Sequence, residues 1–289
     1  MQASYSGVIL GSIYALMAMS FTLTFGAMRF LNLALGALFT LGGYVAWVVA
    51  SGLGLHPLIG IAAAFGVAAM TGVGIHGIVI RPLIGKPGWE MATIIATLGV
   101  GIVLENLLLL IFGPRNKSIP PIAAGSFVVG DLLRVQNQHL VIFGVALLVL
   151  GAMGLFLNRS RHGLAIRAIA QNLTAASLVG VPVRRMFLLV TGISAGLAAV
   201  AGVLLSAFYF LSPTVGLTII LKALVVTIFG GLGSIPGTLY AAFIVGLLEA
   251  YVIMYLGARW ALPFLFVFLV LVLIVRPSGI LGIRPEARA

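Results

Sequence analysis

The chain has 289 residues, 62% of them hydrophobic and only 7% charged, with a mean hydropathy of +1.26. Soluble globular chains carry about 45–50% apolar and about 25% charged residues, so this composition excludes a soluble domain, a disordered chain and a fibrous repeat, and it predicts a membrane protein. The net charge of +11 comes from cationic residues that mostly stand between apolar runs, which indicates topology signals rather than nucleic-acid binding.

Apolar runs follow one another along the whole chain. A membrane-spanning helix needs about 20 mostly apolar residues. By this measure helices are predicted at 5–27, 31–50, 57–80, 91–112, 139–157, 186–210, 217–232, 236–256 and 260–276. The runs are apolar on every side and longer than the strands of a membrane barrel, which alternate over about ten residues. The predicted fold is therefore an all-α polytopic membrane protein.

The number of crossings is left open between eight and nine. The break at 29–32 is very short, and the run 217–232 is barely long enough to span. At least one of these segments is expected to be broken or re-entrant, because non-helical backbone is tolerated at membrane depth where it faces protein or water. Nine crossings would put the N-terminus outside, and eight would put it inside.

Cationic residues set the expected orientation. One alternating topology gathers most of them on a single side: Arg29, Arg81, Lys86, Arg159, Arg161, Arg167, Arg184, Arg185, Arg276, Arg284 and Arg288. The opposite side holds Arg115, Lys117, Arg134, Lys222 and Arg259. The positive-inside rule then predicts that 159–185 and the C-terminus are cytoplasmic and that 113–138 is an external loop.

No stretch is long and polar enough for a soluble domain. The longest is the 28-residue run 158–185, so we interpret 1–289 as one transmembrane domain with 158–185 as its cytoplasmic loop. The chain has no P-loop and no room for a nucleotide-binding fold. Its energy must come from an ion gradient, a partner protein or downhill diffusion. The chain has no cysteine and its four histidines are scattered, so no metal site is expected.

The loop 158–185 has a helical, apolar centre between arginines. Residues 165–170 can form one short helix, and Asn172 is expected to cap a second one over 173–179. Gly180 can supply the left-handed residue that ends it. The result is a short helix along the membrane face. It is either an interfacial helix anchored to anionic lipid or a docking helix for a cytoplasmic subunit.

The residues of this second helix carry a family resemblance. Thr174–Gly180, read as TAASLVG, resembles the EAA-x-x-x-G loop of ABC importer permeases, with Thr174 in place of the usual Glu. Further stretches resemble the LivH-type permeases of the branched-chain (hydrophobic) amino-acid ABC importers, in the family's order: 11–47, 163–168, 222–223 with 230–237, and 277–282. Leu35 stands where that family often has His, which predicts a more apolar substrate.

The resemblance implies a transport subunit of a bacterial cytoplasmic (inner) membrane and no enzyme. The expected function is ATP-driven import, by alternating access, of branched-chain or other hydrophobic amino acids or related small carboxylates or amides. The expected partners are a second, LivM-like permease subunit or a second copy, two cytoplasmic ATPase subunits, an external substrate-binding protein and membrane lipid. No cofactor is expected in this chain, because ATP and Mg would belong to the ATPase subunits. The expected ATPase-docking residues are Arg167, Leu173, Thr174, Ala175, Ala176, Leu178 and Gly180.

Two other classes of function remain open: an ion-coupled carrier acting alone and a passive channel. A carrier would use Glu105 or Glu249, which fall within apolar runs. A charge at the bilayer centre costs about 2.5–3.5 kcal/mol, so each is expected to face protein or water. A structural carboxylate is the favoured interpretation for Glu105, and the family resemblance implies a structural or gating role for Glu249.

Three polar residues are candidates for the substrate path. Lys222 either snorkels to the interface, which is favoured, or faces the path and meets a substrate carboxylate. Asn32 is favoured as a helix N-cap, and a half-helix start at this point could also bind a carboxylate. Thr97 is the third candidate.

Glycines account for two further features. Gly230, Gly231 and Gly233, followed by Pro236, predict a tight turn between two helices rather than a phosphate loop. Gly192 and Gly196 belong to a small-residue face. Packing within the chain is favoured for that face over contact with a second permease subunit.

Overall fold

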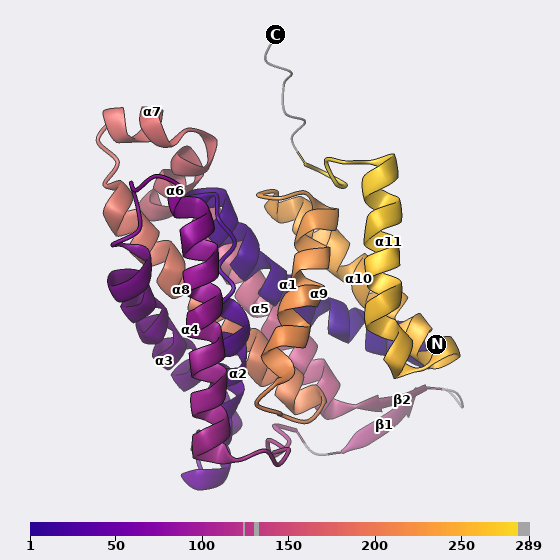
Figure 1. The fold of residues 1–289 in the computed structure, drawn as a ribbon. Helices are drawn as coiled ribbons and strands as arrows, with labels where there is room; N and C mark the ends of the chain where they lie inside the picture. The colour runs from indigo at the N-terminus through magenta and orange to yellow at the C-terminus, as the bar shows by residue number, and fades with distance from the viewer. Residues whose placement is uncertain (124, 130–132, 283–289) are drawn as a thin grey trace.

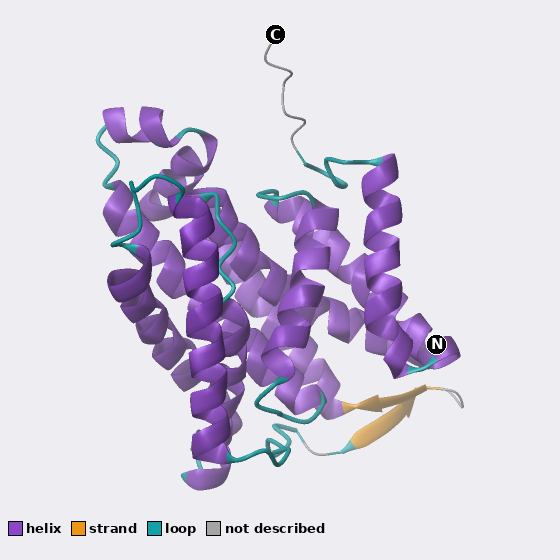
Figure 2. Cartoon of the chain, in the orientation of Figure 1, coloured by secondary structure: helices purple, strands orange, loops and turns teal. Residues whose placement is uncertain are grey.

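The computed structural model describes residues 1–123, 125–129 and 133–282, and most of them are helical (Figures 1 and 2). The helices are α1 (Gln2–Met28), α2 (Leu35–Trp47), the π-helix η1 (Val48–Gly52), α3 (Pro57–Ile75), the π-helix η2 (His76–Ile80), α4 (Trp89–Phe112), α5 (Asn137–Arg159), α6 (Arg161–Gln171), α7 (Leu173–Leu178), α8 (Val183–Phe208), α9 (Val215–Gly230), α10 (Ile235–Leu256), the 3₁₀-helix η3 (Ala258–Trp260) and α11 (Ala261–Val275). The predicted all-α polytopic fold is confirmed.

Among the described residues, eight helical segments are long and apolar enough to span a membrane, and the 16-residue α9 is a shorter apolar helix. In Figure 1, α9 rises beside the long helices, and the chain alternates direction between the two ends of the bundle. We call the end with α6 and α7 the α7 end and the other the hairpin end. α1 begins toward the hairpin end and α11 finishes toward the α7 end. With α9 included, the chain runs nine times between the two ends of the bundle.

The chain leaves the helical conformation between α1 and α2, where the sequence predicts a short break. Arg29 closes α1 with a left-handed backbone, φ 61°, and α2 begins only at Leu35. The loop between them descends into the bundle, where the Leu33 N–H donates to Thr97 Oγ1 at 3.2 Å. Thr97 lies eight residues into α4, about 12 Å from its first residue. The broken segment 29–34 therefore runs from the exposed Arg29 to Leu33 inside the bundle.

A small β-hairpin stands in the segment 113–138, which contained no predicted strand. β1 (Ser126–Val129) pairs antiparallel with β2 (Leu133–Gln136), with Ser126 opposite Gln136. Strands of four residues hold too few alternations to be recognised from a pattern. A single bridge between Lys117 and Leu211 joins this segment to the loop before α9.

The small-residue face of α8 packs inside the chain. A side-chain Cβ built at Gly196 would lie 2.6 Å from the ring of Phe65 on α3, and one at Gly192 would lie 3.1 Å from Val73. At Gly202 it would overlap the carbonyl of Phe39 on α2. Close approach of α8 to α2 and α3 requires these glycines, in agreement with the favoured interpretation.

Candidate functional site

The helix α7 is held at both of its ends by local hydrogen bonds. At the start, the Ala175 N–H donates to Asn172 Oδ1 at 3.0 Å. At the end, the Val181 N–H donates to the Ala176 carbonyl and the Gly180 N–H to the Ser177 carbonyl, each at 3.1 Å. Gly180 has φ 85°, so this pair of bonds forms a Schellman motif. The conformations predicted for Asn172 and Gly180 are confirmed.

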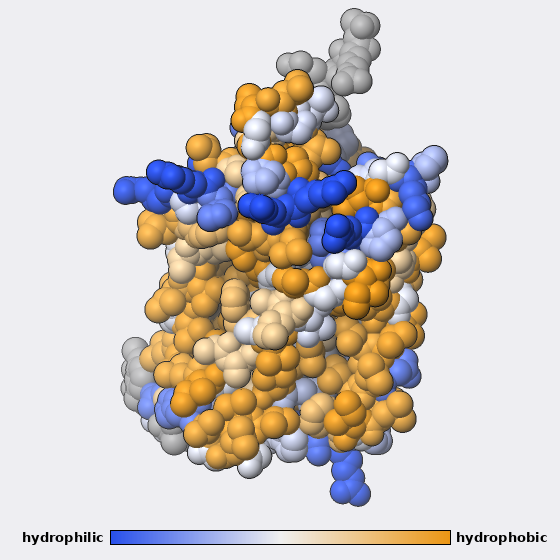
Figure 3. Space-filling model, turned by 90° about the vertical axis from the view of Figure 1, so that its left-hand side faces the viewer, coloured by the Kyte–Doolittle hydropathy of each residue, from blue (hydrophilic) through white to orange (hydrophobic). Residues whose placement is uncertain are grey.

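α7 presents apolar side chains that the chain itself leaves uncovered. Leu178 is 83% exposed, Val179 79% and Leu173 45%, whereas Ala176 is buried. Thr174 and Ala175 are exposed too. In Figure 1 the helix lies at the far end of the molecule, and Figure 3 shows apolar surface at that end beyond a band of hydrophilic side chains. An apolar surface on a projecting, capped helix is suited to a partner's groove.

Two arginines tie this loop to the bundle. Arg167 on α6 donates from Nη1 to Asn158 Oδ1 at 3.3 Å. Arg29, at the break after α1, donates from Nη2 to the Ala170 carbonyl at 2.8 Å. Ala170 stands two residues before Asn172, the cap of α7. Sequence reasoning used Arg29 only as a topology signal, because nothing in its neighbours indicates contact with a residue 141 positions away.

The broken segment meets one of the predicted path residues. Asn32 is 1% exposed, and its Oδ1 accepts the Ala34 N–H at 3.1 Å. The N-cap position of α2 belongs to Ala34, so the N-cap interpretation of Asn32 is wrong by two residues. The reason is a turn over 33–34 that precedes the helix. Thr97 is fully buried and bonds to Leu33, the residue that follows Asn32, whereas Lys222 has its partners on other helices.

A cavity of about 220 Å³ opens beside the broken segment, between α2, α4 and α9. Its lining is Leu33, Gly36, Ala37, Leu98, Gly101, Ile102, Glu105, Leu217, Ile220, Leu221 and Leu224. Glu105 is the single ionisable side chain among these residues. Leu35, which stands where the family often has His, is fully buried and does not belong to the lining. Its proposed effect on the substrate stays a prediction.

Lys222 forms an ion pair inside the bundle. Its Nζ lies 2.6 Å from Glu249 Oε1, and the two side chains are 13% and 3% exposed. Tyr14 on α1 donates to Glu249 Oε2 at 2.8 Å, and the Lys222 ammonium donates to the Tyr14 hydroxyl at 3.3 Å. The favoured snorkelling of Lys222 is wrong, because its partner lies on the neighbouring helix α10 rather than at the interface. These contacts join α1, α9 and α10 and satisfy the Glu249 carboxylate.

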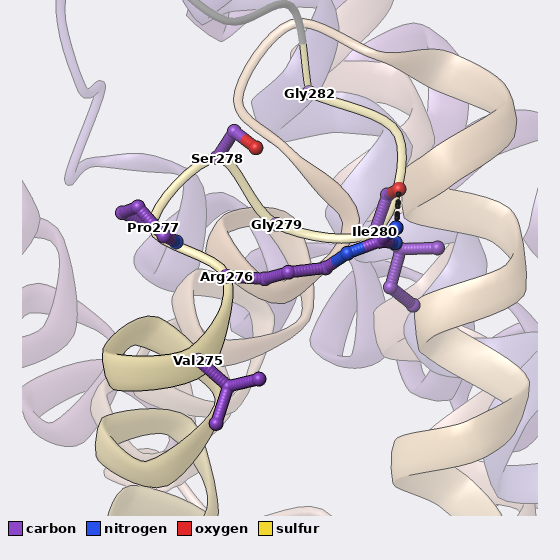
Figure 4. Close-up of a pocket in the computed structure, with 7 residues that line it drawn as sticks. All are labelled: Val275, Arg276, Pro277, Ser278, Gly279, Ile280 and Gly282. Atoms are coloured by element: carbon purple, nitrogen blue, oxygen red, sulfur yellow. Dashed lines mark hydrogen bonds between the residues drawn. The ribbon is translucent and has the colours of Figure 1, made fainter.

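The turn after α9 is held by the segment that follows α11 (Figure 4). The Ile280 N–H donates to the Phe229 carbonyl at 2.8 Å and the Leu281 N–H to the Gly230 carbonyl at 3.2 Å. A Cβ at Gly231 would lie 2.5 Å from the Gly282 nitrogen. Two stretches noted separately in the sequence, 230–237 and 277–282, are therefore in direct contact.

The predicted turn itself is present. Gly231 and Gly233 have φ of 99° and 86°, and Pro236 stands in the first turn of α10. The Ser234 hydroxyl accepts the Gly237 N–H at 3.3 Å and caps that helix. A shallow hollow of about 490 Å³ lies over the adjoining C-terminal segment, lined by Val275, Arg276, Pro277, Ser278, Gly279, Ile280 and Gly282 (Figure 4). Within the described residues there is no group of three or more His, Asp or Glu that could hold a metal.

The family model described as "branched-chain amino acid transport system / permease component" matches residues 5–275. The chain belongs to this family. The permease LivH of the high-affinity branched-chain amino acid transport system of Escherichia coli K12 is 34% identical over 99% of this chain and 96% of its own length. BraD of Pseudomonas aeruginosa, named as a permease of the same kind of system, has the same identity and coverage.

A solved structure supports the fold of this family member. The chain resembles one from the structure titled "PsaBC from Streptococcus pneumoniae in complex with Fab", with a TM-score of 0.53 and 17% identity over 96% of this chain and 91% of that one. The relatives are permease components of transport systems and not enzymes. They give no support to an ion-coupled carrier that acts alone.

Proposed function

We propose that this permease is the membrane subunit of an ATP-driven importer for branched-chain or other hydrophobic amino acids or related small carboxylates or amides. The observation that carries the proposal is α7, a capped helix with exposed Leu178 and Leu173 at the projecting end of the bundle. The proposed role of α7 is to dock in a cytoplasmic ATPase subunit. ATP and Mg would be bound by that subunit and not by this chain.

The distribution of charge supports an orientation with the α7 end in the cytoplasm of a bacterial inner membrane. The short helices, helix ends and turns at the α7 end contain Arg29, Arg81, Lys86, Arg159, Arg161, Arg167, Arg184, Arg185 and Arg276, whereas the segments at the hairpin end contain Arg115, Lys117 and Arg259. Arg284, Arg288 and the side chain of Arg134 lie outside what is described. With nine crossings, the proposed N-terminus is external and the C-terminus cytoplasmic.

Docking of α7 would be driven mainly by apolar burial. Fully burying one leucine side chain is worth about 1.5–3 kcal/mol. Thr174 cannot supply the charge of the Glu that the ABC permease loop usually has at this place. The competing role, a lipid anchor, would use the same leucines but needs no specific groove.

A contact route leads from α7 to the cavity. The Ala170 carbonyl, just before the α7 cap, is held by Arg29, and Arg29 begins the broken segment whose Leu33 lines the cavity. We propose that movement of α7 on an ATPase subunit shifts this segment and so alternates access to the cavity. The residues Asn32 and Thr97 would act here as path elements.

The proposed assembly contains further subunits. These are a second, LivM-like permease subunit or a second copy of this chain, two ATPase subunits and an external substrate-binding protein. Helix α4 has the smallest buried share of the candidate spans, which makes it available for contact with lipid or with the second permease. The chain 1–289 would act as one transmembrane domain, with 158–185 as its coupling loop.

Replacing Leu178 with Asp tests the docking role. The variant would lose an apolar contact worth about 1.5–3 kcal/mol, so we expect at least a tenfold weaker pull-down of the ATPase subunits and loss of ATP-driven leucine uptake. Leu232→Asp is the matched control, since Leu232 is a 44% exposed leucine at the same end but outside α7. Full ATPase binding and full uptake by Leu178→Asp would leave α7 as a lipid anchor.

A further inference from the structure

Glu105 is a carboxylate in a predicted membrane span, with no hydrogen-bond or ion-pair partner among the residues that the structure describes. It stands seven residues before the end of α4, about 10 Å inside the hairpin end of a helix about 36 Å long, which puts it within a hydrocarbon core of about 30 Å. No hydrogen bond or ion pair reaches its carboxylate from the part of the chain that the structure describes. The next residue, Asn106, is exposed and donates from its side-chain amide to the Ile102 carbonyl at 2.8 Å.

Hydrocarbon is an unfavourable environment for the polar side chains of Glu105 and Asn106. A carboxylate in the hydrocarbon region costs about 2.5–3.5 kcal/mol on insertion scales, and such groups face protein or a water-filled cavity. Glu105 lines the cavity between α2, α4 and α9, so its carboxylate faces this cavity rather than a bonding side chain of the described residues. Water or a ligand in this hollow would solvate the charge.

The lining of this cavity defines the chemistry of a ligand. Its walls are leucine, isoleucine, alanine and glycine, and Glu105 adds one negative charge. Apolar walls with one placed charge bind a molecule that has an apolar body and one cationic group. At about 220 Å³ the cavity is smaller than the roughly 300–1,000 Å³ of drug-sized pockets, so it is suited to a small solute.

We propose that Glu105 contacts the ammonium group of an amino acid in transit, while the leucine and isoleucine walls contact its apolar side chain. This inference rests on the proposed import of hydrophobic amino acids and adds the group that receives their positive charge. It differs from the expectation that Lys222 meets the substrate carboxylate, because the Lys222 charge is engaged by Glu249.

Charge-selective thiol labelling tests the cavity independently of any substrate. The chain has no cysteine, so Ile102→Cys would place a single thiol in the cavity wall. In the assembled importer we expect a cationic methanethiosulfonate to react about tenfold or more faster than an anionic one, because a charged cleft concentrates ions of opposite sign. The ratio should fall to about 1 when Glu105→Gln is added. Leu110→Cys, which is exposed but outside the lining, is the control.

Transport measurements test the substrate. In proteoliposomes of the complete importer, Glu105→Gln should lower leucine uptake about tenfold or more while the ATPase activity stimulated by the loaded binding protein remains. Glu105→Asp should restore part of the uptake. Glu90→Gln is the matched control, since Glu90 is an exposed carboxylate in the first turn of the same helix.

Several results would overturn the inference. They are an unreactive Ile102→Cys, equal rates for the two reagents, or unchanged leucine uptake by Glu105→Gln. Loss of the second permease subunit from a pull-down of Glu105→Gln would instead assign the carboxylate to a subunit contact and also contradict the proposal. A wild-type complex that shows the labelling ratio but imports no amino acid would contradict the proposed function, and that outcome is distinguishable from the others.

Discussion

Glu105 and Glu249 are both carboxylates at membrane depth, but their surroundings differ. Glu249 on α10 is buried against α1 and α9, where Tyr14 donates to one of its oxygens and Lys222 pairs with the other. Glu105 borders a cavity and has no such partners in the described chain. The paired charge joins three helices, whereas the unpaired charge is available to a molecule that enters. The depth of a charged residue in the membrane therefore does not distinguish a structural charge from a functional one.

The largest expected effect on stability comes from breaking the ion pair between Lys222 and Glu249. Lys222→Met leaves Glu249 as an uncompensated buried carboxylate, which costs about 3–5 kcal/mol for a buried pair. We therefore expect a large fall in the temperature at which the purified subunit unfolds, measured by fluorescence-detected size exclusion. The double variant Lys222→Met with Glu249→Gln should recover most of the loss, because no charge is then left unpaired. Wild-type stability for the single variant would show that the pair is not structural.

A smaller effect is expected from Tyr14→Phe. The change removes one hydrogen bond to the Glu249 carboxylate, and such bonds to charged groups are worth about 1.5–3 kcal/mol. The ion pair with Lys222 stays, so the loss of stability should lie below that of Lys222→Met in the same unfolding assay. An equal loss in both variants would mean that the tyrosine hydrogen bond stabilises the carboxylate as much as the ammonium does, and would contradict this ranking.

The smallest effect on stability is expected at the other carboxylate. Glu105→Gln breaks no hydrogen bond or ion pair among the described residues, so its free energy of unfolding should change by no more than about 0.5 kcal/mol. A destabilisation as large as that of Lys222→Met would contradict the contrast between the two sites. Thermal unfolding of Glu105→Gln beside Glu90→Gln makes this comparison on one helix.

The sequence predicts well what depends on local pattern. Apolar runs give the helices to within a few residues. The caps of α7 follow from Asn172 and Gly180, because their hydrogen bonds join residues close together in the chain, such as Asn172 with Ala175 and Gly180 with Ser177. The break after α1 was also predictable, because a polar segment interrupts an apolar run. The charged residues themselves were visible as candidates for function.

The sequence does not show which of these charged residues form pairs in the folded chain. Lys222 and Glu249 are 27 positions apart, and Tyr14 is 235 positions from Glu249, so only the packing of α1, α9 and α10 brings them together. The same holds for the bond from Arg29 to Ala170, which depends on where α6 folds back. The surroundings of Glu105 are likewise a property of the assembled bundle, and the sequence alone favours a structural carboxylate there.

The most direct test compares ATP-driven leucine uptake by two neutralised variants at equal amounts of assembled complex. We predict that Lys222→Met with Glu249→Gln keeps most of the wild-type uptake, because the pair joins helices and does not touch the substrate. Glu105→Gln should lose about tenfold or more, although its bundle is as stable as the wild type. The reverse result, with transport lost in the double variant and kept in Glu105→Gln, would contradict the assignment of both carboxylates.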